Sequence, residues 1–445
     1  MTRLGVATKG QCLLQTIEEP SRLATSMPRE IAETEEEPPS SSASTNRSRF
    51  FAHVADKDWC DWKWQFRNRI TTVEELGKHI PLSTGESARL KLVTIKYPLA
   101  VTPYYLSLIN LDNPQDPIRN QSIPAFEEIT MGSVGYEDPL EEQRESVVPG
   151  LVHRYPDRVL MVLTDICAML CRHCTRKREW KNGGWVRDDS HVEAMIQYIR
   201  RHPEVRDVII SGGDPLTLST RRLESVLAAL RAIRHVEIVR IGTRFPVVLP
   251  QRIDDELCNV LSKYGPIWVN THFNHPKEVT EESAKACDRL LRAGVPVNNQ
   301  SVLLKGINDS VRTMTDLCHK LLKAKVRPYY LFQCDEVQGT EHLRTSVDAG
   351  VSIIEGMRGH TSGLAVPTFV VDLPHGGGKV SVQPNYIVSR TDGEIVFRNY
   401  ERRLVRYRNP GTTRPVCGRR NGKASAIQTD AASFEMLDPI AWRPA

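Results

Sequence analysis

The sequence predicts an α/β fold in which about six β/α units form a partial parallel barrel. From Val159 onward, short apolar runs alternate with amphipathic helical stretches, the pattern of parallel strands joined by helices. Polar groups follow most of these runs, as they do at the carboxyl mouth of a barrel, where barrel enzymes place their chemistry. The strands are expected at residues 158–164, 208–210, 236–241, 267–269, 295–297 and 327–332.

A helical region precedes the predicted barrel and a C-terminal extension follows it. We expect residues 1–50 to be a disordered extension, because residues 32–45 are of low complexity. Residues 1–17 carry two basic residues and no acidic one, which suits a weak transit peptide or an untargeted tail. The predicted parts are residues 1–50, a helical region at 51–148, the barrel at 149–378, and a lysine-bearing segment with the extension at 379–445.

Composition narrows the class of protein. The chain has 445 residues, is 40% hydrophobic and carries a net charge of +5, with no Lys/Arg block, so nucleic-acid binding is not indicated. No apolar run approaches the ~20 residues of a membrane span. Most cysteines are scattered singly, which favours a reducing compartment. We therefore expect a cytoplasmic protein, or a mitochondrial one if the first residues are a transit peptide.

Three cysteines on the loop after the first predicted strand are the most informative motif. Cys167, Cys171 and Cys174 have the spacing Cys-x3-Cys-x2-Cys. A structural zinc site needs four protein ligands, and an electron-transfer [4Fe-4S] cluster usually has four cysteines. Three thiolates leave one iron of a cubane cluster open, and S-adenosylmethionine (SAM) could chelate it. The alternative is a fortuitous spacing of core thiols.

The cysteine motif and its surroundings resemble the radical SAM superfamily, and within it the lysine 2,3-aminomutase family. The resemblance extends over residues 51–408 and implies a barrel of the radical SAM type. The motifs that carry it are His-Arg-Tyr-Pro-Asp-Arg at 153–158, Cys-Arg-His-Cys-Thr-Arg at 171–176, Ser-Gly-Gly-Asp-Pro-Leu at 211–216, Asn-Thr-His-Phe-Asn-His-Pro at 270–276 and Gly-His-Thr-Ser-Gly at 359–363.

A second chemical centre is the run Leu-Pro-His-Gly-Gly-Gly-Lys at residues 373–379. Glycines allow a loop to present its lysine with freedom to move. By itself the run also suits a phosphate-cradling turn or a mobile surface loop. The resemblance implies that Lys379 is the catalytic lysine that holds pyridoxal 5'-phosphate (PLP). His375 stands where the family usually has another glycine.

Two carboxylates indicate the substrate. Asp335 and Asp372 each follow an apolar run, so both are expected at the barrel mouth, where two acids can bind one ammonium group. In the family the matching pair binds the side-chain ammonium of lysine, whereas relatives that act on glutamate are expected to carry a basic or amide residue. Asp372 alone could equally be a helix cap or a structural acid.

The remaining site residues come from the resemblance. Arg176 would bind the substrate α-carboxylate, for which a guanidinium fork suits bidentate geometry. Arg154, Tyr155 and Arg158 resemble the PLP-contacting segment, although ordinary surface arginines are the alternative. His173 would contact SAM or cap the cysteine loop. The predicted SAM and cofactor wall consists of Ser211, Gly212, Gly213, Asp214, His272 and Gln300.

The family's zinc site is doubtful in this chain. Bacterial members can hold zinc with four cysteines, but here Ser310 stands at the barrel position and only Cys417 remains in the tail. We expect the tail after Arg402 to be loosely ordered, and we expect a homo-oligomer.

The resemblance implies an isomerase, L-lysine 2,3-aminomutase. It would interconvert L-lysine and β-lysine (3,6-diaminohexanoate) through a SAM-derived 5'-deoxyadenosyl radical and a PLP-mediated 1,2-amino migration, and it would need an electron donor for the cluster. The alternatives are the same shift on arginine or ornithine, a non-catalytic iron–sulfur protein that retains the fold, and a PLP enzyme without radicals.

Overall fold

The computed structural model describes residues 42–181 and 183–410, and its centre is a ten-stranded sheet whose spatial order follows the chain. Strands β3 to β9 pair in parallel, while β1 and β2 at one edge and β10 at the other edge pair antiparallel. The strands are β1 (Ser146–Val148), β2 (Leu151–Tyr155), β3 (Arg158–Val162), β4 (Asp207–Ser211), β5 (Ile238–Gly242), β6 (Ile267–Thr271), β7 (Val297–Leu303), β8 (Arg327–Gln333), β9 (Thr368–Leu373) and β10 (Gly378–Ser381).

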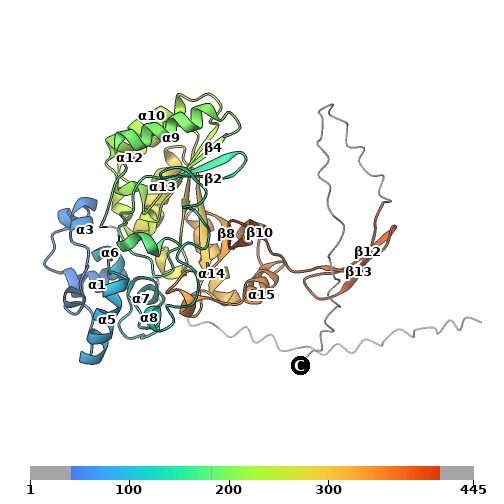
Figure 1. Cartoon of the computed structure of the whole chain (residues 1–445). Coiled ribbons are helices and arrows are strands. Elements are labelled where there is room, and N and C mark those ends of the chain that lie inside the picture. Colours follow the sequence, from blue (N-terminus) through green and yellow to red (C-terminus); the bar gives the residue numbers. More distant parts are fainter. Residues whose placement is uncertain (1–41, 182, 411–445) are drawn as a thin grey trace, which may run out of the picture.

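One long helix separates each pair of successive parallel strands, which confirms the predicted partial barrel (Figure 1). With β3 to β8, these helices make six β/α units, and β9 adds a final parallel strand. A Ser, Thr or Asp side chain caps the first turn of all six, and such a cap stabilises a helix by about 1 kcal/mol. The helices are α9 (Asp189–Arg201), α10 (Thr220–Arg231), α12 (Asp255–Lys263), α13 (Glu281–Arg292), α14 (Val311–Lys323) and α15 (Val347–Met357).

The chain before the sheet is mainly helical, from residue 42 to residue 130. Helix α1 starts at Ser42, inside the range predicted to be disordered, because Phe50 and Phe51 at its end are buried against Trp59 and His79. Residues 1–41 lie outside the described residues. The helices of this region, drawn in blue in Figure 1, are α1 (Ser42–Phe51), α2 (Asp56–Trp59), α3 (Trp62–Arg67), α4 (Val73–Leu76), α5 (Thr84–Lys96), α6 (Pro103–Leu106), α7 (Pro117–Ser122) and α8 (Glu127–Thr130).

The sheet crosses both predicted boundaries of the barrel. Strand β1 lies before residue 149 and β10 continues past residue 378, and both pair with neighbours in the same sheet. The C-terminal extension is partly ordered, since β11 (Ile387–Arg390), β12 (Glu394–Arg398) and β13 (Leu404–Arg408) form a separate antiparallel sheet beside the barrel (Figure 1). In the described part of the chain, no helix has the length and apolar character needed to cross a membrane.

Strand β7 is longer than predicted. The apolar run ends at Val297, so Asn298 was expected to follow the strand, but β7 continues to Leu303. Its polar residues Asn298, Asn299 and Ser301 are buried, and Asn299 Nδ2 donates to the Phe273 carbonyl at 3.0 Å and to Ser301 Oγ at 2.8 Å. The strand was predicted too short because the prediction followed the apolar run, which ends where the polar residues of the strand begin.

Candidate active site

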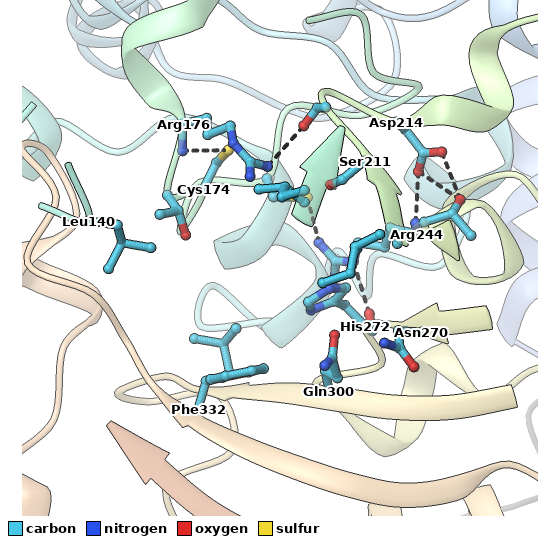
Figure 2. Close-up of a pocket in the computed structure, with 18 of the residues that line it drawn as sticks. Leu140, Cys174, Arg176, Ser211, Asp214, Arg244, Asn270, His272, Gln300 and Phe332 are labelled. Atoms are coloured by element: carbon cyan, nitrogen blue, oxygen red, sulfur yellow. Dashed lines mark hydrogen bonds between the residues drawn. The ribbon is translucent and has the colours of Figure 1, made fainter. Parts of the chain in front are cut away.

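A cavity of about 550 Å³ opens at the carboxyl ends of the parallel strands, and Figure 2 shows part of its wall. Every side chain or glycine that the sequence singled out as a site residue lines it. They are Cys167, Cys171, Cys174, Lys379, Arg154, Tyr155, Arg158, His173, Ser211, Gly212, Gly213, Asp214, His272, Gln300, Arg176, Asp335 and Asp372. The fold thus brings together in one cavity residues that are spread over more than 200 positions of the sequence.

The loop that follows β3 carries the three cysteines and is fastened to the N-terminal helices. Arg172 and Lys177 point away from the cavity, and both bind the carboxylate of Glu128 on α8, at 2.6 and 2.8 Å. All three side chains are buried. Burial favours the neutral carboxyl, but Arg172 and Lys177 outweigh it and lower the pKa of Glu128. The helical region therefore holds the cysteine loop in shape.

The three thiols suit an iron–sulfur cluster. Burial, followed by the charges of neighbouring cysteines, raises the pKa of Cys174 to about 11 and raises that of Cys167 well above its ordinary value. Thiolates in this place therefore need a strong positive charge nearby, which iron supplies. Among the described residues no three His, Cys, Asp or Glu side chains surround a single metal ion. In a cubane cluster each cysteine would bind a different iron, so a cluster site does not need three side chains around a single metal ion.

Two glycines after β4 are in contact with the backbone of the cysteine loop. A Cβ on Gly212 would lie 2.3 Å from the Thr164 carbonyl oxygen, and one on Gly213 would lie 2.4 Å from that of Ile166. Gly212 also has a φ of +142°, which side chains rarely adopt. The resemblance assigned these glycines to the SAM and cofactor wall, and the structure adds that the cysteine loop itself requires them.

The wall beside the glycines is formed by buried groups with different partners. Asp214 accepts from Thr243 Oγ1 at 2.7 Å and from the Arg244 amide at 2.7 Å, and burial raises its pKa to about 7. His173 is buried, and its Nδ1 has no hydrogen-bond partner among the described residues. Burial lowers the pKa of His272 to about 4. A neutral imidazole with an unpaired nitrogen, that of His173, suits a bound polar ligand such as SAM.

Lys379 lies on a strand and not in the glycine loop. It pairs with Asp372 across the β9–β10 hairpin, and its Nζ lies 3.0 Å from Asp372 Oδ1. The hairpin turn contains His375 and Gly376, and Gly378 begins β10; all three residues have positive φ. The predicted freedom of movement therefore belongs to the side chain of Lys379, because the ladder fixes its backbone.

The segment predicted to contact PLP adjoins this hairpin. Tyr155 Oη accepts from the amide of Lys379 at 2.9 Å, and the guanidinium of Arg158 stacks 3.9 Å above the ring of Tyr155. Arg154 is already engaged, because it pairs with Glu145 at 2.5 Å and donates to the carbonyl of Leu140. Arg158 pairs with its neighbour Asp157 at 2.9 Å through Nη1. Its other donors and the Tyr155 hydroxyl would meet a phosphate beside Lys379, which fits PLP.

The two predicted acids lie near one another at the cavity. Thr175 Oγ1 donates to Asp335 Oδ2 at 2.8 Å. Burial, and then the charge of Asp372, raises the pKa of Asp335 to about 7. Lys379 is the one cation paired with this couple in the described residues, so the two carboxylates have room for a second ammonium group.

Arg176 is held by a residue that the sequence did not reveal. Its Nε and Nη2 donate to the two carboxylate oxygens of Glu142 at 2.8 and 2.6 Å, and its Nη1 donates to the Gly212 carbonyl at 3.1 Å. Arg178 also donates to Glu142, at 2.9 Å. Burial would raise the pKa of Glu142, but the two arginines outweigh it and lower the pKa to about 2.

Glu142 belongs to a segment that we call the strap, residues 136–145. Besides the arginines, the strap contacts the β9–β10 turn, where the His375 amide donates to the Pro139 carbonyl at 3.0 Å and His375 Nδ1 lies 3.2 Å from Glu141 Oε1. It also pairs with Glu336, whose carbonyl accepts from the Tyr136 amide at 2.8 Å. The strap's polar sequence has no periodicity that could have indicated these contacts.

Ser310, at the position where bacterial members of the family have a zinc-binding cysteine, has a structural role. Ser310 caps helix α14, and its Oγ accepts from the Thr313 amide at 3.1 Å. Cys417 lies outside the described residues. The residues present near Ser310 thus form a helix cap.

Comparison with known proteins gives a family for the chain. The sequence profile of the radical SAM superfamily matches residues 161–318, and the profile described as Lysine-2,3-aminomutase matches residues 354–437. The L-lysine 2,3-aminomutase of Clostridium subterminale is 54% identical over 83% of this chain and 89% of its own length. That of Acetoanaerobium sticklandii is 53% identical over 82% and 88%.

A relative with another substrate name is also similar. The glutamate 2,3-aminomutase of Clostridioides difficile is 45% identical over 79% of this chain and 83% of its own length. These relatives are aminomutases, and the matches extend over both the barrel and the lysine-bearing hairpin. The chain is therefore an isomerase that belongs to the lysine 2,3-aminomutase family of the radical SAM superfamily.

Proposed function

We propose that the chain is an L-lysine 2,3-aminomutase that interconverts L-lysine and β-lysine. The observation that carries this proposal is the partly buried pair of carboxylates, Asp335 and Asp372, at the cavity. The family alone does not choose the substrate, because it includes relatives named for lysine and for glutamate.

The charge of the pair favours a cationic side chain. Asp372 already forms an ion pair with an ammonium group, that of Lys379, at 3.0 Å. The side-chain ammonium of lysine would take this place when Lys379 is engaged with PLP. The side-chain carboxylate of glutamate would instead face two like charges, an arrangement that costs several kcal/mol.

The other end of the substrate would be bound by Arg176. A guanidinium has five N–H donors. Glu142 takes two of them and the Gly212 carbonyl takes one, so two remain for the substrate α-carboxylate. The positive site at Arg176 and the negative site at Asp335 and Asp372 would hold the amino acid by both ends. Fixing both ends supplies the orientation that the reaction needs.

The cofactors would be held by residues already described. Cys167, Cys171 and Cys174 would hold the cluster, with SAM against His173 and the wall formed by Gly212, Gly213, Asp214, His272 and Gln300. Lys379, Tyr155 and Arg158 would hold PLP. When bound, the cluster and SAM supply the radical that starts the reaction, and PLP supports the migration of the amino group. The protein positions the substrate and excludes water from the cavity.

The proposal is tested by supplying anaerobically reconstituted, reduced protein with SAM, PLP and one of L-lysine, L-ornithine, L-arginine or L-glutamate. Mass spectrometry of the products should find β-lysine, and the other three should react at least tenfold more slowly. Preferential turnover of ornithine, arginine or glutamate would overturn the lysine assignment. The variant Lys379→Ala should retain the cluster but lose PLP absorbance and activity.

A further inference from the structure

A buried arginine, Arg244, lines the cavity beside the cysteine loop, and the proposed function gives it no role. Arg244 follows β5, and its Nη1 donates to Cys171 Sγ at 2.9 Å (Figure 2). Its side chain is only 8% exposed. Within the described residues, no other charged side chain hydrogen-bonds a sulfur of the three cysteines; Cys174 Sγ accepts from a backbone amide, that of Arg176, at 3.3 Å.

The guanidinium of Arg244 is fixed in place by its other bonds. Its Nε donates to the His272 carbonyl at 3.0 Å, and its Nη2 donates to Gln121 Oε1 at 2.7 Å and to Glu278 Oε1 at 2.6 Å. Because these three hydrogen bonds fix the buried guanidinium, it has little freedom to move away from Cys171.

Glu278 is the counterion of Arg244 and is itself fixed. It is fully buried, and it accepts from Tyr105 Oη at 2.6 Å and from the His275 amide at 2.8 Å. Burial disfavours the charged guanidinium, but the charges of Cys171, Tyr105 and Glu278 outweigh it and raise the pKa of Arg244. A permanent positive charge is therefore placed directly against one cysteine sulfur.

Such a contact affects how easily an iron–sulfur cluster is reduced. Hydrogen bonds to the sulfurs and nearby charge are among the factors that set cluster potentials. Reduction adds one electron from an external donor, breaks no bond in the protein and makes the cluster one unit more negative. A positive charge beside it stabilises the reduced form more than the oxidised form.

We propose that Arg244 is a positioning residue that raises the reduction potential of the cluster through Cys171, and that Glu278 limits this effect as its fixed counterion. The inference rests on the proposed function only in requiring that Cys167, Cys171 and Cys174 bind the cluster. It makes no use of the substrate.

The test measures the midpoint potential of the full-length protein, reconstituted with iron and sulfide, by electron paramagnetic resonance during titration with dithionite. Neither SAM, PLP nor lysine is added. We expect Arg244→Gln to shift the potential to a more negative value. Arg244→Lys, which keeps the charge, should shift it less. Iron and sulfide content is measured for each variant.

Two further variants separate this role from general disruption. Glu278→Gln removes the negative charge behind Arg244, so it should shift the potential in the opposite direction, to a less negative value. Arg252→Gln is the matched control, because Arg252 is also buried but its hydrogen bonds are with Leu216, Leu218 and Thr220 and its ion pair is with Asp254. Its variant should keep the native potential.

An unchanged potential in Arg244→Gln with full iron content would overturn the proposal. So would equal shifts in the Gln and Lys variants. If Arg244→Gln does not retain the cluster, the sign of the Glu278→Gln shift decides: a less negative potential supports the proposal, and any other result contradicts it. Because lysine is absent, failure of the substrate assignment would leave this result unaffected.

Discussion

Glu142 and Arg176 meet through two parallel hydrogen bonds, from Nε to Oε2 at 2.8 Å and from Nη2 to Oε1 at 2.6 Å. This side-on pair turns the remaining donors of Arg176 toward the cavity. The strap thereby takes part in the site although no strap residue was singled out from the sequence.

Replacing Glu142 by Gln should weaken lysine binding more than it slows turnover. A hydrogen bond to a charged group contributes about 1.5–3 kcal/mol, so we expect KM for lysine to rise by about 10- to 100-fold. Steady-state kinetics of reconstituted protein measure the change. Glu137→Gln is the matched control, since Glu137 is exposed on the same strap and its ion pair with Lys181 is also exposed. Equal kinetics of both variants would show that the Glu142 pair has no role.

Asp335 should give lysine turnover a pH dependence near neutrality. Burial and the charge of Asp372 raise the pKa of Asp335 to about 7, so this carboxyl is protonated below that pH and ionised above it. Only the ionised form attracts the substrate ammonium, so kcat/KM for lysine should rise with pH and level off above about 7. Asp335→Asn should lower kcat/KM and abolish this inflection. An inflection that persists in the variant would assign it to another group.

Gly213 should be indispensable for the shape of the cysteine loop. In Gly213→Ala the new Cβ would meet the Ile166 carbonyl oxygen at 2.4 Å, so the loop must shift. We expect reduced iron content after reconstitution and a lower Tm. Gly85→Ala is the control, because a Cβ there has no neighbour within 4 Å. Full iron content in Gly213→Ala would contradict the close approach.

Glu128 should contribute to stability as well as to cluster loading. Removing one partner from a buried ion pair typically costs about 3–5 kcal/mol, because the remaining charges lose their counterion. In Glu128→Gln both Arg172 and Lys177 lose the negative charge with which they are paired. Urea unfolding of the apoprotein should show a loss of this size, and iron content should fall. Glu127→Gln is the control, because Glu127 is the exposed neighbour of Glu128. This variant should match the native protein in urea unfolding and in iron content.

Sequence patterns predicted the barrel and the location of its site because both follow from periodicity and from motif position. Alternating runs gave the parallel strands, and residues at strand ends necessarily meet at one mouth, as Cys167 and Asp335 do. The resemblance supplied the individual residues, and all of them line the cavity.

Other features depend on partners that are distant in the sequence. Glu142 is 34 positions from Arg176, and Arg244 is 73 positions from Cys171, and neither belongs to a periodic pattern. Lys379 was expected on a loop because three glycines precede it, whereas pairing of β10 with β9 places it on a strand. Each of these features depends on a tertiary contact with a residue distant in the sequence or on strand pairing, and the local sequence does not indicate such contacts.

The sheet ends at β1 and β10 and does not close on itself, and the strap lies against the β9–β10 turn from the side of β1. Backbone hydrogen bonds pair the strands from β3 to β9 with one another. The contact between the strap and the β9–β10 turn is made instead by polar side chains and a few backbone amides. Amide hydrogens of the central strands should then exchange with solvent only when the whole domain unfolds, and those of the strap should exchange through small local openings. Small molecules could enter and leave the cavity through such openings while the barrel itself stays folded.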